Sequence, residues 1–190
     1  MRKRRFQKED WVHLGLSELS ENGAEAVKLE AICKAAGLTR GSFYHHFEDH
    51  TVFLIDLAEA WLVLQTETVS HSGSFESISD AELQGLQASI MDIDFRLEIG
   101  MREIARRLKP VADIVQRADS TRLEVLTDIY QRRFALASEA AHELARLEYA
   151  VLNGLVLTWP ETSTPELDTL AGRYREMVQS FLNPERSVSV

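Results

Sequence analysis

Residues 29–47 constrain the fold of this chain more than any other stretch, and they read LEAICKAAGLTRGSFYHHF. Ile32 and Ala36 lie one helical turn apart, which is typical of a helix that buries one face. Gly37 can adopt the positive φ that ends a helix, and Thr39 carries the oxygen that can cap the next one. The pattern predicts two short helices that meet at a tight turn.

The second of these helices has an aromatic inner face. Phe43 and Phe47 repeat at i, i+4, so both rings lie on the same side of a helix. The positions left pointing away from the core are Arg40, Gly41, Tyr44 and His45. Outward arginine, tyrosine and histidine side chains suit the groove of a nucleic acid.

At these residues the sequence resembles the TetR family of one-component transcriptional regulators. The DNA-reading segment of that family has the pattern small, Gly, hydrophobic, Ser/Thr, Lys/Arg, Gly, Ser/Thr, aromatic or Leu, Tyr, any, His, Phe, and residues 36–47 match it position by position. The match extends back to the apolar helix that ends at Asn22-Gly23 and forward to about Leu57. The resemblance implies an all-α fold of about nine helices, with a three-helix N-terminal head that contains a helix-turn-helix and a C-terminal helical bundle body.

Three positions near the turn depart from the family pattern. Lys28 stands where relatives usually carry a capping Ser or Thr, and a missing cap costs about 0.5 to 2 kcal/mol. Glu30 stands where a basic, phosphate-contacting residue is common, so either it points elsewhere or the docking differs in detail. His50 replaces a frequent Lys. We expect these differences to affect the outer phosphate contacts rather than the second helix of the pair.

Charge is unevenly distributed along the chain. The net charge is −9, yet residues 1–50 hold eight Lys or Arg and eight Asp or Glu, so the whole negative excess belongs to residues 51–190. Four of the six histidines also lie in residues 1–50, where a nearby phosphate would favour their charged form. A neutral head on an acidic body directs DNA to one end. The basic run Arg2 to Arg5 is either a solvated terminus or an arm that contacts phosphate or the minor groove.

Composition narrows the class of protein. With 190 residues, 45% hydrophobic residues, 9 Gly and 4 Pro, the chain suits a compact helix-rich protein. No apolar run is long enough to cross a membrane, and the residues after the basic N-terminus are polar, so we expect no signal peptide and a cytoplasmic location. The single Cys33 excludes an internal disulfide and a Cys-based zinc site, and its place inside a helix favours an inert buried thiol.

Helical periodicity continues along the rest of the chain. Asp49 can cap a helix that runs from His50 to about Ser70, and a Ser-rich loop follows at 70–74. Ser79 and Glu82 form a capping box for the next helix. Besides the pair at 29–47, helices are predicted at 8–22, 50–70, 80–92, 93–108 and 110–134, the last with Pro110 in its first turn.

The C-terminal part carries more apolar surface than one chain needs. Residues 149–159 are apolar on almost every side, so a helix there needs partners on both faces. Pro160 stops it, and the last helix begins at 164–166. Five side chains of that helix recur at the spacing of a heptad seam, namely Leu167, Leu170, Tyr174, Met177 and Phe181. We expect a two-fold dimer through these two helices, as the resemblance also implies; the alternative is a seam folded onto the chain's own body.

These features favour a DNA-binding transcriptional regulator with a helix-turn-helix head at 1–50 and a helical ligand-binding and dimerisation body at 51–190. We expect a repressor that a small-molecule effector releases from a near-palindromic operator. The expected partners are double-stranded DNA, a second copy of the chain and that effector. No membrane, metal, cofactor or catalytic residue is expected, so we do not expect an enzyme.

Arg40 is the strongest candidate for reading DNA sequence, because its fork can bond both acceptors of guanine. Gly41 leaves room for close approach, and Tyr44 could bond phosphate or pack against a thymine methyl. His46 could bond phosphate, or instead pack and cap against the fourth helix. The residues assigned to DNA binding are Thr39, Arg40, Gly41, Ser42, Tyr44, His45 and His46.

An effector site in the body is implied by the resemblance alone. The large or functional side chains that could line it are Trp61, Phe95, Met101, Arg102, Tyr130 and Tyr149, with Met91 and Phe134 as further members. Core packing is the better explanation for most of them. Arg102 could pair with an anionic ligand, although a solvated arginine is the simpler interpretation.

Two other functions are weighed against the regulator. Glu139 and His142 place a carboxylate and an imidazole at i, i+3, a pair that di-metal helical bundles use twice. No second copy accompanies it, and Asp92, Asp94 and Glu98 do not complete the set, so we interpret it as a solvated face. The other alternative is an interaction module of the same fold that has lost DNA binding, which Glu30 and the missing cap support.

Overall fold

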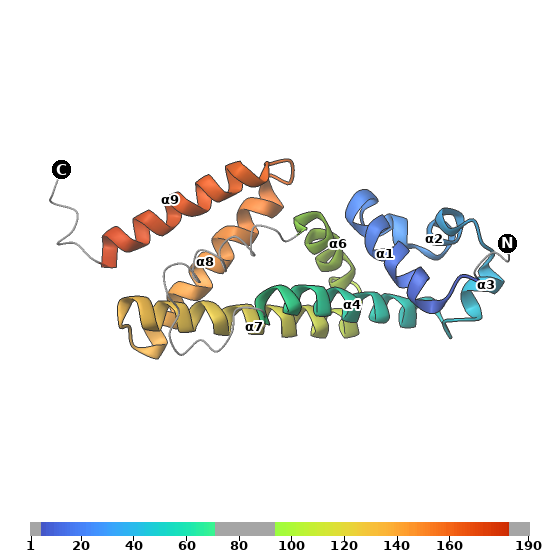
Figure 1. Cartoon of the computed structure of the whole chain (residues 1–190), viewed down its shortest axis with the longest axis horizontal. Coiled ribbons are helices and arrows are strands. Elements are labelled where there is room, and N and C mark those ends of the chain that lie inside the picture. The colour runs from blue at the N-terminus through green and yellow to red at the C-terminus, as the bar shows by residue number, and fades with distance from the viewer. Residues whose placement is uncertain (1–4, 71–93, 183–190) are drawn as a thin grey trace. The chain divides into compact units, whose positions relative to one another are not determined.

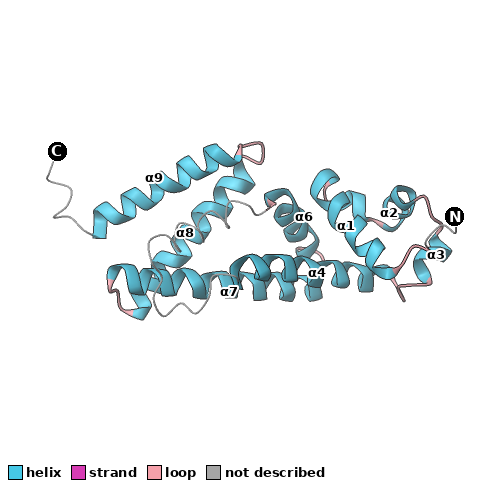
Figure 2. Ribbon diagram, viewed as in Figure 1, coloured by secondary structure: helices cyan, strands magenta, loops and turns pink. Residues whose placement is uncertain are grey.

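The computed structural model describes residues 5–70 and 94–182, and within these ranges all regular secondary structure is helical (Figure 1, Figure 2). The all-α prediction is therefore confirmed for the described residues. The elements are α1 (Lys8–Asn22), the 3-10 helix η1 (Ala24–Val27), α2 (Leu29–Ala36), α3 (Arg40–Tyr44), α4 (His50–Ser70), α6 (Phe95–Ala105), α7 (Lys109–Phe134), α8 (Ser138–Thr158) and α9 (Thr164–Leu182).

Most predicted helix boundaries lie within a few residues of the observed ones. Asp49 caps α4 as predicted, since its carboxylate accepts a hydrogen bond of 2.9 Å from the Val52 backbone N–H. α6 begins later than predicted because Asp94 caps it, accepting from the backbone N–H of Arg96 and Leu97 at 3.0 and 3.3 Å. The predicted helix at 80–92, the capping box of Ser79 and Glu82, and the Ser-rich loop beyond Ser70 lie outside the described residues.

The chain divides into two compact units, which are described separately. The described part of the first comprises residues 5–70 and 94–119, and that of the second comprises residues 120–182. These units follow the packing of the chain. The predicted boundary at residue 50 concerns function rather than packing, and it stays a prediction.

In the first unit, two glycines allow helices to approach α1 closely. A Cβ atom on Gly15 would lie 2.8 Å from Leu57 Cδ1 and from Phe53 Cζ, both on α4. A Cβ atom on Gly100 of α6 would lie 2.6 Å from Leu19 Cδ1 and 3.3 Å from the Leu19 backbone oxygen. The α1–α6 contact is reinforced by the Ser20 hydroxyl, which donates to the Asp94 carboxylate. α1 is therefore tightly packed on both sides.

In the second unit, a hydrophobic cluster that includes one large aromatic and two small side chains joins α7 to α8. Tyr130 of α7 and the alanines 141 and 145 of α8 are all buried, at 4%, 0% and 0% exposure. α8 begins at Ser138, well before the apolar run at 149–159 that predicted a helix. The sequence did not predict the first half of α8, because these small alanines, rather than large apolar residues, lie on its inner face.

The close approach of α6 to α1 makes Gly100 a sensitive position. Gly100→Ala should lower the free energy of unfolding by about 1 to 3 kcal/mol, because the added methyl group meets Leu19 on a tightly packed face. Gly172→Ala, in α9, is the matched control. Among the described residues, no atom beyond its chain neighbours and its own helix backbone lies within 4 Å of the added Cβ, so alanine should be neutral or stabilise the helix by up to about 1 kcal/mol. Urea denaturation of both variants measures the difference, and equal stabilities would contradict the described packing.

Candidate nucleic-acid interface

The turn between α2 and α3 has the predicted geometry. Gly37 adopts a left-handed conformation with φ of 64° and ψ of 29°, which favours glycine. Its N–H donates to the Lys34 oxygen at 3.0 Å, and the N–H of Leu38 donates to the Cys33 oxygen at 3.0 Å. These bonds satisfy carbonyl groups at the end of α2 and turn the chain sharply toward α3.

Thr39 caps α3 as predicted, because its side-chain oxygen accepts a hydrogen bond of 3.2 Å from the Ser42 backbone N–H. α3 is short and ends at Tyr44. Phe47 nevertheless keeps the helical spacing from Phe43, since the Phe47 N–H donates to the Phe43 oxygen at 3.1 Å. The predicted i, i+4 pairing of the two rings therefore holds beyond the helix itself.

The inner face of α3 is a buried aromatic cluster. Phe43 is completely buried, and Phe47 is 1% exposed. The Phe43 ring meets Trp11 of α1 and Phe53 of α4 edge to face, each with a centroid distance of 5.3 Å. It also packs on Phe47 at 4.9 Å. Such pairs add about 0.5 to 1.5 kcal/mol each beyond the burial of their area, so α3 is held firmly by α1 and α4.

The opposite face of α3 is open to solvent. Arg40, Gly41 and His45 are exposed, and Tyr44 is 49% exposed. The outward orientation predicted for these four positions is therefore confirmed. Of the other DNA-binding candidates, Thr39 is exposed, whereas Ser42 and His46 are half-buried. The rings of His45 and His46 lie edge to face at 5.0 Å. No structural observation tests the DNA contacts themselves.

Two of the three unusual positions near the turn have structural roles. Lys28, the residue before α2, makes no capping bond through its side chain, as expected, and instead pairs with Glu25. His50 lies at the start of α4, and its Nε2–H donates to the backbone oxygen of Val27 at 2.8 Å. His50 thus joins α4 to the end of η1, a contact that the sequence analysis did not find.

The third unusual position, Glu30, bears directly on the strongest DNA-reading candidate. Its carboxylate forms an ion pair with the Arg40 guanidinium, from the first turn of α2 to the first residue of α3. Both side chains are exposed, Glu30 by 79% and Arg40 by 59%. Glu30 therefore points toward Arg40 on the solvent side of the two helices, and both alternatives stated for its effect on DNA docking stay predictions.

Cys33 is buried as predicted, with 6% exposure. Burial raises the pKa of its thiol, and the Arg40 charge opposes this shift without cancelling it. A thiol whose pKa is raised carries less of the reactive thiolate, which agrees with an inert structural cysteine.

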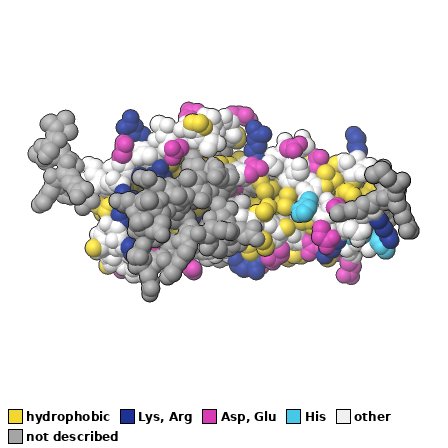
Figure 3. All heavy atoms as spheres, in the orientation of Figure 1, with side chains coloured by type: hydrophobic (Ala, Val, Ile, Leu, Met, Phe, Trp, Pro, Cys, Tyr) yellow, Lys and Arg dark blue, Asp and Glu magenta, His cyan; other side chains and the backbone are white. Residues whose placement is uncertain are grey.

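Basic and acidic side chains are mixed on the head. Among the basic side chains of residues 5–50, Lys8 pairs with Asp56 of α4, Lys28 with Glu25 and Arg40 with Glu30. The space-filling view shows basic, acidic and histidine side chains near one another over this part of the chain (Figure 3, right). Two of these pairs, Lys28 with Glu25 and Arg40 with Glu30, join opposite charges within residues 1–50.

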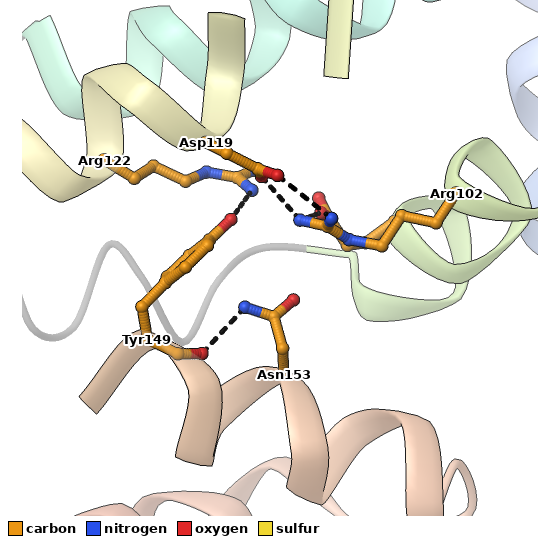
Figure 4. A network of polar contacts seen from close by, with 6 residues as sticks. Arg102, Asp119, Arg122, Tyr149 and Asn153 are labelled. Carbon is orange, nitrogen blue, oxygen red and sulfur yellow. Dashed lines mark hydrogen bonds and ion pairs between the residues drawn. The ribbon is translucent and has the colours of Figure 1, made fainter. Parts of the chain in front are cut away.

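The effector-site candidates of the first unit are mostly core residues. Trp61 and Met101 are completely buried in the hydrophobic core, and Phe95 is half-buried. The expectation of a solvated Arg102 is wrong, because its side chain is only 23% exposed and forms an ion pair of 2.7 Å with Glu98. It forms a second ion pair, of 2.6 Å, with Asp119 (Figure 4). Asp119 binds the guanidinium through both carboxylate oxygens. A ligand role for these residues stays a prediction, and Met91 lies outside the described residues.

In the second unit, the two candidate tyrosines make specific polar contacts. The Tyr149 hydroxyl accepts a 3.0 Å hydrogen bond from Arg122, and the Tyr149 backbone oxygen accepts one of 2.8 Å from Asn153 (Figure 4). The Tyr130 hydroxyl donates to Glu148 at 2.8 Å. Glu148 was not singled out by the sequence analysis, because no periodicity distinguishes a buried glutamate from an exposed one.

Glu148 of the second unit is unusually buried for a carboxylate, with only 8% exposure. Burial raises the pKa of its carboxyl, while the Tyr130 hydrogen bond and the charges of Arg175 and Arg133 lower it to a smaller extent. Burial and the adjacent Glu148 together raise the pKa of the Tyr130 hydroxyl. The tyrosine therefore acts as the donor in this pair.

The di-metal alternative gains no support from the described residues. Glu139 and His142 are exposed, and His142 Nδ1 lies 3.3 Å from the Thr127 hydroxyl oxygen. Across residues 5–70 and 94–182, no three His, Cys, Asp or Glu side chains are arranged to hold a metal ion. None of the helices in these ranges combines the length and hydropathy of a membrane span.

A glycine-terminated helix, a capped second helix and an aromatic core that leaves the second helix exposed define a helix-turn-helix protein. Residues 13–54 match the model of the bacterial regulatory proteins of the tetR family. The chain is therefore similar to this family over its helix-turn-helix segment. It is also 40% identical over 50 residues to the transcriptional regulator AcuR of Cereibacter sphaeroides, a match that covers 26% of this chain and only 23% of that relative.

Solved structures share the fold over nearly the whole chain. A transcriptional regulator of the TetR/AcrR family matches with a TM-score of 0.72 at 18% identity, covering 90% of this chain and 96% of its own. A regulator from Rhodococcus sp. Rha1 matches with a TM-score of 0.65 at 19% identity, covering 87% and 94%. The ketosteroid transcriptional regulator KstR2 of Mycobacterium tuberculosis matches with a TM-score of 0.58 at 16% identity, covering 92% and 96%. At these identities the likeness concerns the fold.

The buried Glu148 should make stability depend on pH. Because its pKa is raised in the folded state, the folded chain holds this proton more tightly, and the free energy of unfolding should fall as pH rises from the ordinary glutamate pKa of about 4.3 through the raised value. Glu148→Gln should remove this part of the pH dependence. Glu143→Gln, at an exposed glutamate of the same helix, should keep the wild-type dependence. Denaturant unfolding across this pH range tests the prediction, and parallel curves for all three proteins would refute it.

Proposed function

We propose that this protein is a DNA-binding transcriptional regulator, a repressor that a small-molecule ligand releases from near-palindromic operator DNA. The observation that carries the proposal is the division of α3 into a buried aromatic face and an exposed face that bears Arg40, Tyr44 and His45. The match of residues 13–54 to the model of a family of regulatory proteins supports it. The head at 1–50 would bind DNA in the cytoplasm, and the body at 51–190 would bind the ligand and the second copy.

Each DNA-binding candidate has a role that suits its position. Arg40, the first residue of α3, would read guanine through two hydrogen bonds in the major groove. Gly41 lets the backbone approach closely, and the Tyr44 hydroxyl would bond phosphate or its ring would meet a thymine methyl. Contacts to phosphate that fix the register would come from Thr39, Ser42, His45 and His46.

Exposed apolar side chains on the last two helices support a dimer. In α9, Leu170, Met177 and Phe181 are 40%, 69% and 81% exposed. In α8, Leu147 and Leu157 are 56% and 53% exposed. Leu167, by contrast, is buried at 5% within its own chain, so the heptad seam is shared between the chain's core and an outward face. A second copy would cover that face by two-fold symmetry.

Such a dimer would place its two α3 helices on successive turns of one DNA face, about 34 to 36 Å apart or a multiple of that distance. A ligand needs to supply only about 1 to 3 kcal/mol of coupling to favour another spacing. α6 offers a route from body to head, because it packs against α1 through Gly100 and through the Ser20–Asp94 hydrogen bond.

The second candidate function is an interaction module of the same fold without DNA binding. The Glu30–Arg40 ion pair favours it, because the carboxylate occupies part of the arginine fork and repels phosphate. The two functions differ in a direct measurement. A regulator binds duplex DNA with an affinity that falls steeply as salt is added, and the module does not.

Arg40→Ala should relax sequence preference at one base pair of each half-site. Loss of a bidentate contact to guanine costs about 1 to 3 kcal/mol, or roughly 5- to 150-fold in discrimination. Selection of bound duplexes from a random pool, repeated with the variant, measures this loss. Arg96→Ala, at an exposed arginine of α6, should select the wild-type sequence. An Arg40→Ala protein with unchanged preference would refute the assignment.

Met177→Glu should weaken the proposed dimer, because it places a charge in the centre of the exposed apolar face of α9. Sedimentation velocity over a range of concentrations should show a monomer at concentrations where the wild type is a dimer. Thr169→Glu adds the same charge to an exposed position of α9 outside the seam and should remain dimeric. A wild-type protein that is monomeric at every concentration would contradict this interface.

A further inference from the structure

The ion pair between Glu30 and Arg40 joins the two helices of the helix-turn-helix on their solvent side. Arg40 Nη2 contacts Glu30 Oε1, while both side chains stay largely exposed. An exposed pair of this kind contributes only about 0 to 1 kcal/mol to folding. Its main consequence is therefore the direction that it gives to the arginine side chain.

The guanidinium group has more donors than this contact uses. It carries five N–H donors in a planar fork, and a guanine edge requires two of them. Arg40 can thus keep Glu30 on one edge and present N–H donors to a base on another. Holding the side chain in one orientation also reduces the conformational entropy lost when it binds.

The Glu30 carboxylate also weakens sequence-independent binding to the DNA backbone. A negative charge beside Arg40 repels the phosphates of any duplex, whatever its sequence. Two other carboxylates, Asp56 beside Lys8 and Glu25 beside Lys28, lower the attraction of these lysines for phosphate in the same way. Only a duplex that offers the matching base to Arg40 compensates for this repulsion.

From these contacts we infer that Glu30 is a specificity-determining residue, which positions Arg40 for a base edge and suppresses sequence-independent binding. The inference rests on the proposed DNA-binding function. Glu30, at a position where the family commonly has a basic residue, would thus raise the ratio of specific to non-specific affinity.

The test compares Glu30→Gln with the wild type on two duplexes at one salt concentration, the selected operator and a scrambled sequence of equal length. Glutamine keeps the shape and removes the charge. The variant should bind the scrambled duplex more tightly without a matching gain on the operator, so the affinity ratio should fall by about tenfold. Glu25→Gln, which removes an exposed, ion-paired carboxylate from the same head, should change both affinities by the same factor.

A second arm separates positioning from simple charge removal. In an Arg40→Ala background, Glu30→Gln should leave base preference unchanged, because there is no arginine to direct. Equal effects of Glu30→Gln and Glu25→Gln on the affinity ratio, or an effect of Glu30→Gln on base preference without Arg40, would overturn the inference while leaving the regulator intact. A wild-type protein that binds no duplex at low salt would overturn the proposed function and the inference together.

Discussion

The packing of the Phe43 ring is the contact on which the rest of the head depends. α3 has only five residues, too few for a helix that is stable alone in water. Phe43 joins it to Trp11 of α1 and Phe53 of α4, and both contacts are edge to face. These contacts, together with Phe47 and the Thr39 cap, determine which side chains of α3 are exposed.

Local features of the head could be predicted because short-range chemistry determines them. Gly37, Thr39 and Asp49 act through bonds to residues no more than four positions away, and the structure shows each in its expected role. The inward Phe43 and Phe47 follow from helical spacing in the same way. A motif that combines turn, cap and core positions leaves few alternative folds.

Contacts between distant segments could not be predicted, because no periodic pattern encodes them. Ser20 and Asp94 are 74 positions apart, and His50 reaches Val27 across 23. The sequence does not reveal the close approach at Gly100, because a glycine is equally typical of a turn. The expectation of a solvated Arg102 failed for the same reason, since one of its partners, Asp119, lies on another helix. The Glu30–Arg40 pair spans only ten positions, but its geometry depends on the angle between two helices.

Under the proposed function, the length of α3 limits how many base pairs one head can read. Its five residues present a single arginine fork and few other side chains to a groove. A bacterial or larger genome offers about 10⁶ to 10⁹ competing positions, and each fully specified base pair reduces that number only fourfold, so a unique address needs about ten or more base pairs. In the proposed dimer, two short half-sites at a fixed separation would supply this length, and that separation would itself contribute to specificity.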